Sequence, residues 1–311
     1  MDNINSSILN SVFTQSLDSA SGKEKLAVAG ASYVRDRLRE TSFAAKILPM
    51  QQVTKADLQR STTHEGLTKI VDIEPQSLAM ALNFTSEPDG RFISAPRFEI
   101  PFFTISSERF QKTEQQLQSY EMPITKVIEQ NSVKDLQRIQ DRTFMIYAYA
   151  AVLAASAISG GVNKNIQQAG QTNIRAKADV VEIFDALDDD ELAVGTLLMA
   201  KSMFNSWLTL PNSEIGSILN SEVAVDGYKY NTLLGHKVIT TIKNNIIFPN
   251  EIWCFAQPDF LGKHYVLNNV KFYIDKRANM VEWQTWFDLG MGIVNIRSVV
   301  RKFFGTTDPR T

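Results

Sequence analysis

The chain is poor in cysteine and histidine and has almost no net charge. Its 311 residues include one cysteine, Cys254, and three histidines. A single cysteine excludes an intrachain disulfide framework and any cysteine cluster that holds a metal, and it favours a cytosolic setting. A net charge of −2 gives no basic surface for sequence-specific nucleic-acid recognition, so only passive contact with nucleic acid remains open.

Long hydrophobic runs are also lacking. The longest apolar stretch, Phe144 to Ile158, has about 15 residues, whereas a membrane-spanning helix needs about 20. The first residues, MDNINSSILNSVF, have neither the basic start nor the apolar core of a signal peptide. Apolar residues make up 44% of the sequence and charged ones 21%, as in ordinary globular proteins. We therefore expect no membrane contact and one elaborate domain or two.

The sequence contains no recognisable metal-binding pattern. His64, His236 and His264 have no second histidine at ligand spacing, which favours surface or packing roles. The acidic run 188–191 lacks the glycine and the spaced ligands of a calcium loop. A solvated loop is therefore favoured over a cation site for this run.

Catalytic patterns are missing too. The stretch 290–292, Gly-Met-Gly, lacks the third glycine, the helix and the acidic residue of a dinucleotide fingerprint. Cys254 lies in an apolar strand, where a thiol is inert, and no Gly-x-Ser-x-Gly elbow occurs. We expect no enzyme, and no catalytic, cofactor-binding or metal-binding residue. Few basic residues lie among the large aromatic ones, which favours core and interface packing over stacking on nucleic acid: Trp207, Trp253, Trp283, Trp286, Phe92, Phe98, Phe102 and Phe103.

The N-terminal third is predicted to hold an arm, a helix and a long ribbon. Residues 1–22 are polar with scattered aliphatics, typical of a mobile or partner-dependent arm, and 23–39 have the spacing of an amphipathic helix. Strands are predicted over 67–83 and 91–105 around the turn 86–90. Pro96 and Pro101 indicate that the second limb is an edge strand, because proline cannot donate a ladder hydrogen bond. The apolar face of this limb, formed by Phe92, Phe98, Ile100 and Phe102, needs another surface to pack on.

One long helix is predicted over 123–158. Its first two-thirds carry an apolar stripe that should face the core, formed by Ile124, Ile128, Leu136, Ile139 and Ile146. From Phe144 onward the helix is apolar nearly all round, which predicts burial on every side.

The C-terminal half mixes helices and strands, so the expected class is α+β. Asn173 should cap a helix over 173–187, followed by a strand at 192–199, a helix at 201–208 and a loop at 211–227. The segment 234–262 reads as two strands with Ile242, Ile247 and Phe255 in the core. Alternation over 270–289 predicts a hairpin that turns at 276–279, and an apolar tail covers 293–304.

The order of these parts resembles that of the major capsid proteins of tailed bacteriophages, whose shell fold is shared with encapsulins. The resemblance covers residues 35–304 and depends on pattern and order rather than on an invariant motif. The stretches that carry it are 34–40 (VRDRLRE) with 46–49 (KILP), 234–238 (LGHKV) with 241–243 (TIK), 258–262 (PDFLG) and 292–295 (GIVN).

The resemblance implies a division of the chain. An N-terminal arm with a short helix would occupy 1–40. Residues 41–122 would hold the extended ribbon, about 61–101, and the start of a peripheral domain. The spine helix of that domain would be 123–159, an axial domain 160–290, and residues 291–311 would return to the peripheral domain beside the spine helix.

The resemblance also implies a function. The protein would assemble through pentamers and hexamers into an icosahedral shell around a phage double-stranded DNA genome. Its partners would be copies of itself, a separate scaffolding protein, a portal, a possible decoration protein and, non-specifically, the packaged DNA. It would reside in the virion after assembly in the cytoplasm of the bacterial host.

Other interpretations stay open at this stage. An encapsulin-like compartment shares the fold, and a phage tail or connector component or an α/β enzyme with a scattered site are further alternatives. Part of the capsid family crosslinks its subunits through a lysine and an asparagine. Lys69 and Asn295 are conceivable candidates here, although ordinary surface and turn roles are favoured.

Overall fold

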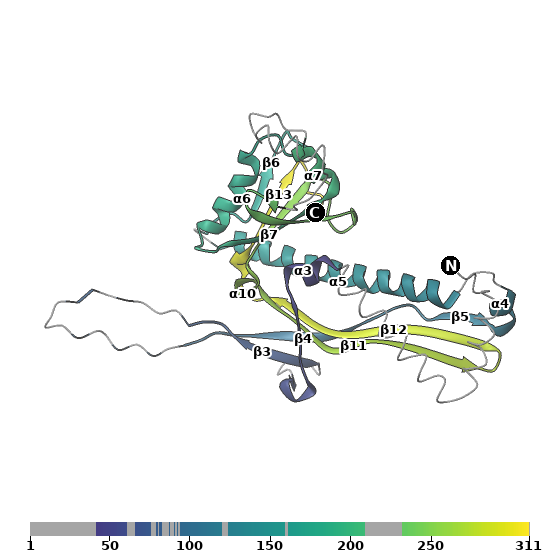
Figure 1. The fold of residues 1–311 in the computed structure, drawn as a ribbon. Helices are drawn as coiled ribbons and strands as arrows, with labels where there is room; N and C mark the ends of the chain where they lie inside the picture. The colour runs from purple at the N-terminus through teal and green to yellow at the C-terminus, as the bar shows by residue number, and fades with distance from the viewer. Residues whose placement is uncertain are drawn as a thin grey trace.

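The computed structural model describes residues 42–60, 66–119, 124–158, 161–208 and 232–310, with gaps at scattered positions between 76 and 93. The expected arm and helix of residues 1–40 and the loop at 211–227 lie outside these residues. The described chain forms two sheets that share one long helix, which confirms the expected α+β class (Figure 1).

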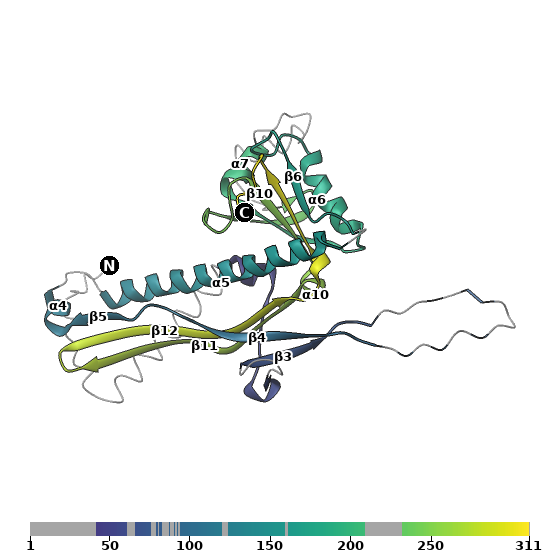
Figure 2. The same ribbon diagram turned by 180° about the vertical axis from the view of Figure 1, so that it is seen from behind.

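The long helix α5 connects the two parts of the molecule. It runs from Ile124 to Ser156, 33 residues, close to the predicted range. At 1.5 Å per residue it is about 50 Å long. It lies along the first sheet, and its C-terminal end passes below the unit that carries the second sheet (Figures 1 and 2).

The first sheet has seven strands and is built on one long hairpin. β11 (Gly262–Arg277) and β12 (Met280–Ile293) pair antiparallel, which confirms the predicted hairpin and extends it at its base. β5 (Phe110–Thr113) joins β12 near the hairpin tip and leads into α4 (Glu114–Ser119). The remaining strands complete the order β1-β11-β12-β4-β3-β2: β1 (Met50–Gln52), β2 (Gln59–Arg60), β3 (Leu67–Asp72) and β4 (Arg97–Ser106).

The second sheet has six strands in the order β6-β13-β10-β7-β9-β8. One face packs against α6 (Ala178–Asp188) and α7 (Lys201–Leu208), and the other shares a core with α5. Alternate residues of the central strands divide between these two cores, as the two-residue period of a strand requires. The strands are β6 (Asn165–Gln168), β7 (Val194–Ala200), β8 (Thr232–Leu233), β9 (His236–Thr241), β10 (Glu251–Ala256) and β13 (Val299–Phe304).

Four further short helices lie in the described residues. α3 (Phe43–Ile47) packs against α5, and η1 (Lys55–Asp57) follows β1. α10 (Pro258–Leu261) and η2 (Ile296–Ser298) lie where the chain passes between the two sheets.

The sheets do not follow the expected boundaries at 160–290 and 291–311. Strands β11 and β12, residues 262–293, pair with β1 and β4 in the first sheet, although the axial range was expected to include most of them. Strand β13 lies between β6 and β10 in the second sheet. The expectation that residues 291–311 return to the unit of the first sheet is therefore wrong for residues 299–304. The tail does contact α5, because Val299 packs in the core that α5 shares with both sheets.

The ribbon strands, predicted over 67–83 and 91–105, are shorter in the described residues, and the predicted edge strand is an edge only along each stretch, not in the order of the sheet. β4 lies between β3 and β12 in the sheet. It pairs with β3 up to Pro101 and with β12 from Phe102 onward, so each stretch of β4 has one paired side. That arrangement tolerates Pro101, because a residue paired on one side needs no second set of hydrogen bonds.

Burial of α5 differs from the prediction. Leu136, Phe144 and Met145 are buried, whereas Ile139, Ile146 and Leu153 are 42%, 57% and 45% exposed. The expectation of burial on every side of the C-terminal end is therefore wrong for the single chain. Apolar sequence alone cannot distinguish a face that packs within the subunit from one that stays open.

Two further local predictions are wrong. α6 begins at Ala178 rather than after Asn173, because the Asp179 carboxylate accepts hydrogen bonds from the backbone N–H groups of Arg175 and Ala176 at 2.9 and 3.1 Å. Ile242 is 78% exposed and not part of the core. Ile247 and Phe255 are buried as predicted.

The glycine pair of β12 has a packing role. A Cβ atom added at Gly290 would lie 3.0 Å from two ring atoms of Phe102, and one at Gly292 would lie 3.1 Å from the Phe98 ring. Phe98 and Phe102 belong to β4, which carries the chain back from the long loop. The two glycines therefore form a floor on which the rings at the base of that loop rest.

We predict that Gly290→Ala lowers the free energy of unfolding by about 1–3 kcal/mol, because the added methyl group overpacks the site under the Phe102 ring. Gly66→Ala is the control, since a Cβ there meets nothing within 4 Å. Chemical denaturation measures both variants. A second change, Phe102→Leu, should restore part of the loss, and equal stability of the two alanine variants would contradict the steric argument.

Candidate functional site

The histidines and the cysteine do not converge on a site. His264 is buried, with Gln140 Nε2 and the Leu48 carbonyl oxygen each 3.3 Å from its ring, and burial lowers its pKa to about 4. His236 packs edge-on against Phe184 at 4.9 Å. Cys254 is buried, and burial raises the pKa of its thiol. His64 lies outside the described residues, and among those residues no three histidine, cysteine or acidic side chains gather in a way that could hold a metal.

The acidic run 188–191 is only partly the solvated loop that the sequence predicts. Asp190 forms ion pairs with Lys164, whose side chain is buried, and with Arg297 at 3.4 Å. Lys164 also donates to the Ala186 carbonyl oxygen at the end of α6. Asp190 is therefore the counter-ion of a buried lysine, a role that carries no local sequence signal because Lys164 is distant in the chain.

The two crosslink candidates have structural contacts of their own. The Lys69 ammonium lies 3.9 Å from an Asp57 carboxylate oxygen. Asn295 caps η2, where its side-chain oxygen accepts a hydrogen bond from the Arg297 N–H at 3.1 Å.

A buried carboxylate, Asp141, holds the start of α3 against α5. Ser42 Oγ and the Ala44 N–H donate to one carboxylate oxygen at 2.7 and 3.1 Å, and Lys243 Nζ donates to the other at 2.6 Å. Burial raises the pKa of Asp141, and Lys243 and the two other donors oppose that rise. Asp141 thus ties three parts of the chain together: the N-terminal side of α3, α5, and the turn after β9.

The base of the long loop is a second well-defined structure. Val53, Ile100 and Tyr265 are buried there, and the rings of Phe102 and Tyr265 stack at 6.4 Å. Phe98, which was predicted to share a face with Ile100, packs against the same cluster. This small core joins β1, β4 and β11 on the face of the first sheet that carries the glycine floor.

Beyond this base, the described part of the loop is open to solvent. Leu82 is 43% exposed and Phe92 is 100% exposed. Where β3 ends and β4 begins, the described chain points away from the body on the side opposite the β11–β12 tip (Figures 1 and 2). A rigid base therefore carries apolar side chains that the described residues of this chain do not cover.

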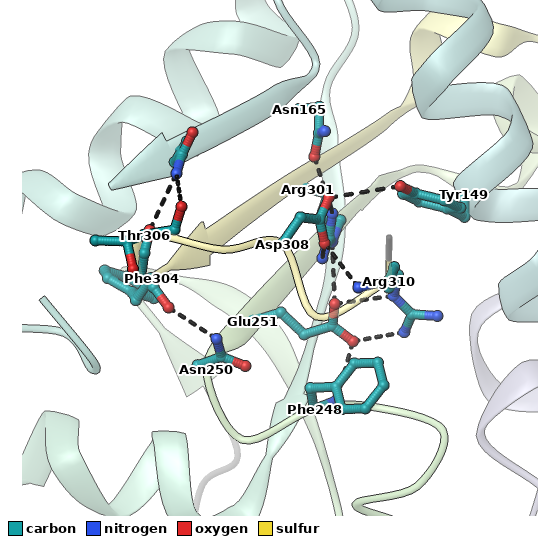
Figure 3. Close-up of polar contacts among 12 residues, drawn as sticks. Tyr149, Asn165, Phe248, Asn250, Glu251, Arg301, Phe304, Thr306, Asp308 and Arg310 are labelled. Atoms are coloured by element: carbon teal, nitrogen blue, oxygen red, sulfur yellow. Dashed lines mark hydrogen bonds and ion pairs between the residues drawn. The ribbon is translucent and has the colours of Figure 1, made fainter. Parts of the chain in front are cut away.

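A network of charges holds the C-terminal residues against α5 and the second sheet (Figure 3). Arg301, buried in β13, donates to Asp308 through both Nη atoms at 2.8 and 2.6 Å and to Glu251 through Nε at 3.0 Å. Arg310 donates to the same Glu251 carboxylate at 2.9 and 2.5 Å. Two arginines and two carboxylates thus balance in a largely buried site.

Aromatic rings surround these arginines. The Arg301 guanidinium lies 5.3 Å from the Tyr149 ring centre and 4.8 Å from that of Phe303, and Arg310 lies 5.1 Å from Trp253. Burial alone would raise the pKa of Asp308, but the hydrogen bonds from Arg301 outweigh it and hold the pKa below its usual value. The tail is therefore a fixed part of the fold.

The tryptophans pack inside the protein and do not form an exposed surface on which nucleic-acid bases could stack. Trp207, Trp253 and Trp283 are buried, and Trp286 is half-buried against Tyr273 at 6.0 Å. No helix in the described part of the chain is long and apolar enough to span a membrane.

Two sheets that share one long helix, with a long loop leaving the first sheet, form the α+β arrangement that the resemblance in sequence led us to expect. No protein-family pattern and no curated protein sequence matches the chain. Solved structures do. A structure from Mycobacterium phage Adephagia has a TM-score of 0.60 at 9% identity, covering 86% of this chain and 91% of that one.

Two of the similar structures are capsids. The capsid of an empty GTA particle has a TM-score of 0.54 at 14% identity, covering 86% of this chain and 91% of that one. The mature capsid of bacteriophage PhiM1 has a TM-score of 0.55 at 8% identity, with coverage of 86% and 88%. The chain therefore has the major capsid fold of tailed phages, as the resemblance in sequence implied.

We predict that Lys243→Met lowers the free energy of unfolding by about 3 kcal/mol at neutral pH, because Asp141 is left buried without its counter-ion. The change also removes a group that opposes the rise in the pKa of Asp141. Since the folded state then favours the protonated carboxyl more than the unfolded state does, the loss should shrink as the pH falls through this raised pKa. Denaturation at several pH values tests this. Lys237→Met, at an exposed position of β9, should show neither effect.

We predict that Arg310→Met lowers stability by about 2 kcal/mol, because the buried Glu251 loses a bidentate partner. Hydrogen exchange should also rise over residues 305–310 while the amides of β10 stay protected. Arg297→Met, which removes a guanidinium with a 56% exposed side chain, is the control and should cost less than about 1 kcal/mol. Unchanged exchange in the tail would contradict the role of Arg310 as its anchor.

Proposed function

We propose that this protein is a major capsid protein that assembles through pentamers and hexamers into an icosahedral shell around phage double-stranded DNA. The observation that carries the proposal is the long loop: a rigid base on the first sheet and apolar residues beyond it that stay exposed in the single chain. The fold shared with phage and GTA capsids supports the same conclusion.

The exposed loop is costly for an isolated subunit. A two-stranded ribbon is marginally stable in water, and exposed apolar residues favour association. In a shell, each loop would lie over a neighbouring subunit and be covered by it. Interlocked contacts of this kind bury roughly 2,000 Å² or more, as in obligate assemblies, so many modest contacts add up to a stable particle.

The two sheets would divide the work of assembly. The unit with the first sheet and α5 would form the periphery, while the second unit would meet its copies around the fivefold and sixfold positions. Closed symmetry then limits the particle to a finite size, whereas an open head-to-tail contact would produce filaments. In this arrangement the protein needs no catalytic residue or cofactor.

The partners follow from the shell role. We infer a separate scaffolding protein, a portal, a possible decoration protein and non-specific contact with the packaged DNA. The protein would reside in the virion after assembly in the bacterial cytoplasm, and the loop and N-terminal arm would move as a procapsid expands. An encapsulin-like compartment would use the same fold, and its particles would enclose protein cargo instead of DNA.

Electron microscopy of the purified protein, alone and with its scaffold, tests this proposal. We predict closed icosahedral particles for the full chain and none for a variant without residues 86–90. The variant should unfold within about 2 °C of the full chain, because the deletion leaves the loop base and every described core cluster intact. A chain that stays monomeric with scaffold present, or a deletion variant that forms normal shells, would overturn the assigned roles.

A further inference from the structure

The face of α5 that points away from the core is an apolar seam that the described residues leave exposed. Ile139, Ile146 and Leu153 recur every seven residues and are 42%, 57% and 45% exposed. The smaller residues Ala150 and Ala157 lie between and beyond them and are also exposed. Alternation of large and small residues at heptad spacing is the pattern into which a second helix packs. We call Ile139, Ile146, Ala150, Leu153 and Ala157 the outer seam.

A hollow beside the seam provides room for side chains. It has a volume of about 350 Å³ and is lined by Ile146 and Tyr149 of α5, by Phe248, and by Pro309 and Arg310 of the C-terminal tail. The tail that forms its far wall is held in place by the Glu251 network. The hollow is therefore part of a fixed surface.

A row of cations borders the N-terminal end of the outer seam. Lys134, Arg138 and Arg142 are spaced four residues apart, which places them on one side of α5, and all three are exposed. Within the described residues none of them forms an ion pair with a carboxylate. The positive charges therefore favour an occupant that places acidic side chains at this end of the seam.

The first residues of the chain match this surface in composition. Residues 1–22 contain Asp2 and Asp18 and no lysine or arginine. Ile8, Leu9, Val12 and Phe13 have the spacing of one helix face. An apolar, mildly acidic segment fits an apolar seam with a basic border.

The same segment is also within reach. The described chain begins at Ser42, whose hydroxyl is hydrogen-bonded to Asp141 of α5. Residues 23–41 could span roughly 60 Å if extended and about 28 Å as a helix, and the seam is about 27 Å long. A tether of this length gives a millimolar local concentration, so even weak docking is populated.

We propose that residues 1–22 of this chain bind along the outer seam of α5, with their apolar side chains on Ile139, Ile146 and Leu153 and Asp18 near the cation row. The bound segment would cover the one face of α5 that the described fold leaves open. This inference goes beyond the shell function and is independent of it.

The test uses thiol labelling at the seam in unassembled subunits. Ile146→Cys places a reactive thiol at an exposed position, and the native Cys254 is buried and stays silent. A maleimide should label this cysteine at least tenfold faster in a chain that lacks residues 1–22 than in the full chain. Asp185→Cys, at an exposed position of α6, is the control and should react equally in both. A synthetic peptide of residues 1–22 should restore protection to the truncated chain, and a scrambled peptide should not.

A full-length charge swap guards against misfolding of the truncated chain. Arg138→Glu with Arg142→Glu should raise the labelling rate, and adding Asp18→Lys should lower it again. Equal rates in full and truncated chains would overturn the proposal. Protection of the truncated chain that grows with protein concentration would assign the seam to a second copy and would overturn it as well. Microscopy of the shells is a separate measurement, so failure of the shell function and failure of this docking are distinguishable.

Discussion

The rest of the structure depends on the burial of one helix between two sheets. Phe144, Met145 and Val152 of α5 pack in a single core with Phe287 and Leu289 of the first sheet and with residues of the second. Neither sheet could bury its inner face without that helix, because a sheet with one uncovered apolar face is not stable in water. The fixed relation between the two units follows from this shared core rather than from a linker. The proposed shell requires such a relation, since the curvature of a closed particle is set by how its units meet.

Buried charges specify how the second sheet joins this core. Arg301 and Lys302 are adjacent in β13 and both fully buried, so their side chains leave the strand on opposite faces. Arg301 finds Glu251 and Asp308 on one face, and Lys302 finds Glu182 at 2.6 Å on the other. Slippage of β13 by one residue would move each cation to the opposite face of the sheet, away from its own carboxylate partners. Buried ion pairs contribute little net stability, so their value here lies in fixing the register.

The sequence predicted the elements well and their surroundings less well. The period of α5, the β11–β12 hairpin and the strands around Cys254 all carry strong local patterns, and the structure confirms them. The position of β13 in the second sheet could not be predicted from the sequence. The run Val299–Phe304 has only the pattern of an apolar tail, and its strand partners lie far away in the sequence. The Asp141 node and the Glu251 network have no local signature for the same reason. The apolar C-terminal half of α5 was assigned to the core, although hydrophobicity reports only that a face will be covered and not by what.

Strand β12 connects the loop base to α5 through its two faces. Leu289, Met291 and Ile293 point into the core with α5, while Gly290 and Gly292 alternate with them and support Phe102 and Phe98. A displacement of the loop would press these rings on the glycine floor and pass through one strand to the helix. Because packed cores resist compression, the coupling would be stiff. The Gly-Met-Gly stretch at 290–292, which superficially resembles the start of a nucleotide-binding motif, therefore has a packing role. Both roles require glycine because a group approaches the backbone closely. Here that group is an aromatic ring rather than a phosphate.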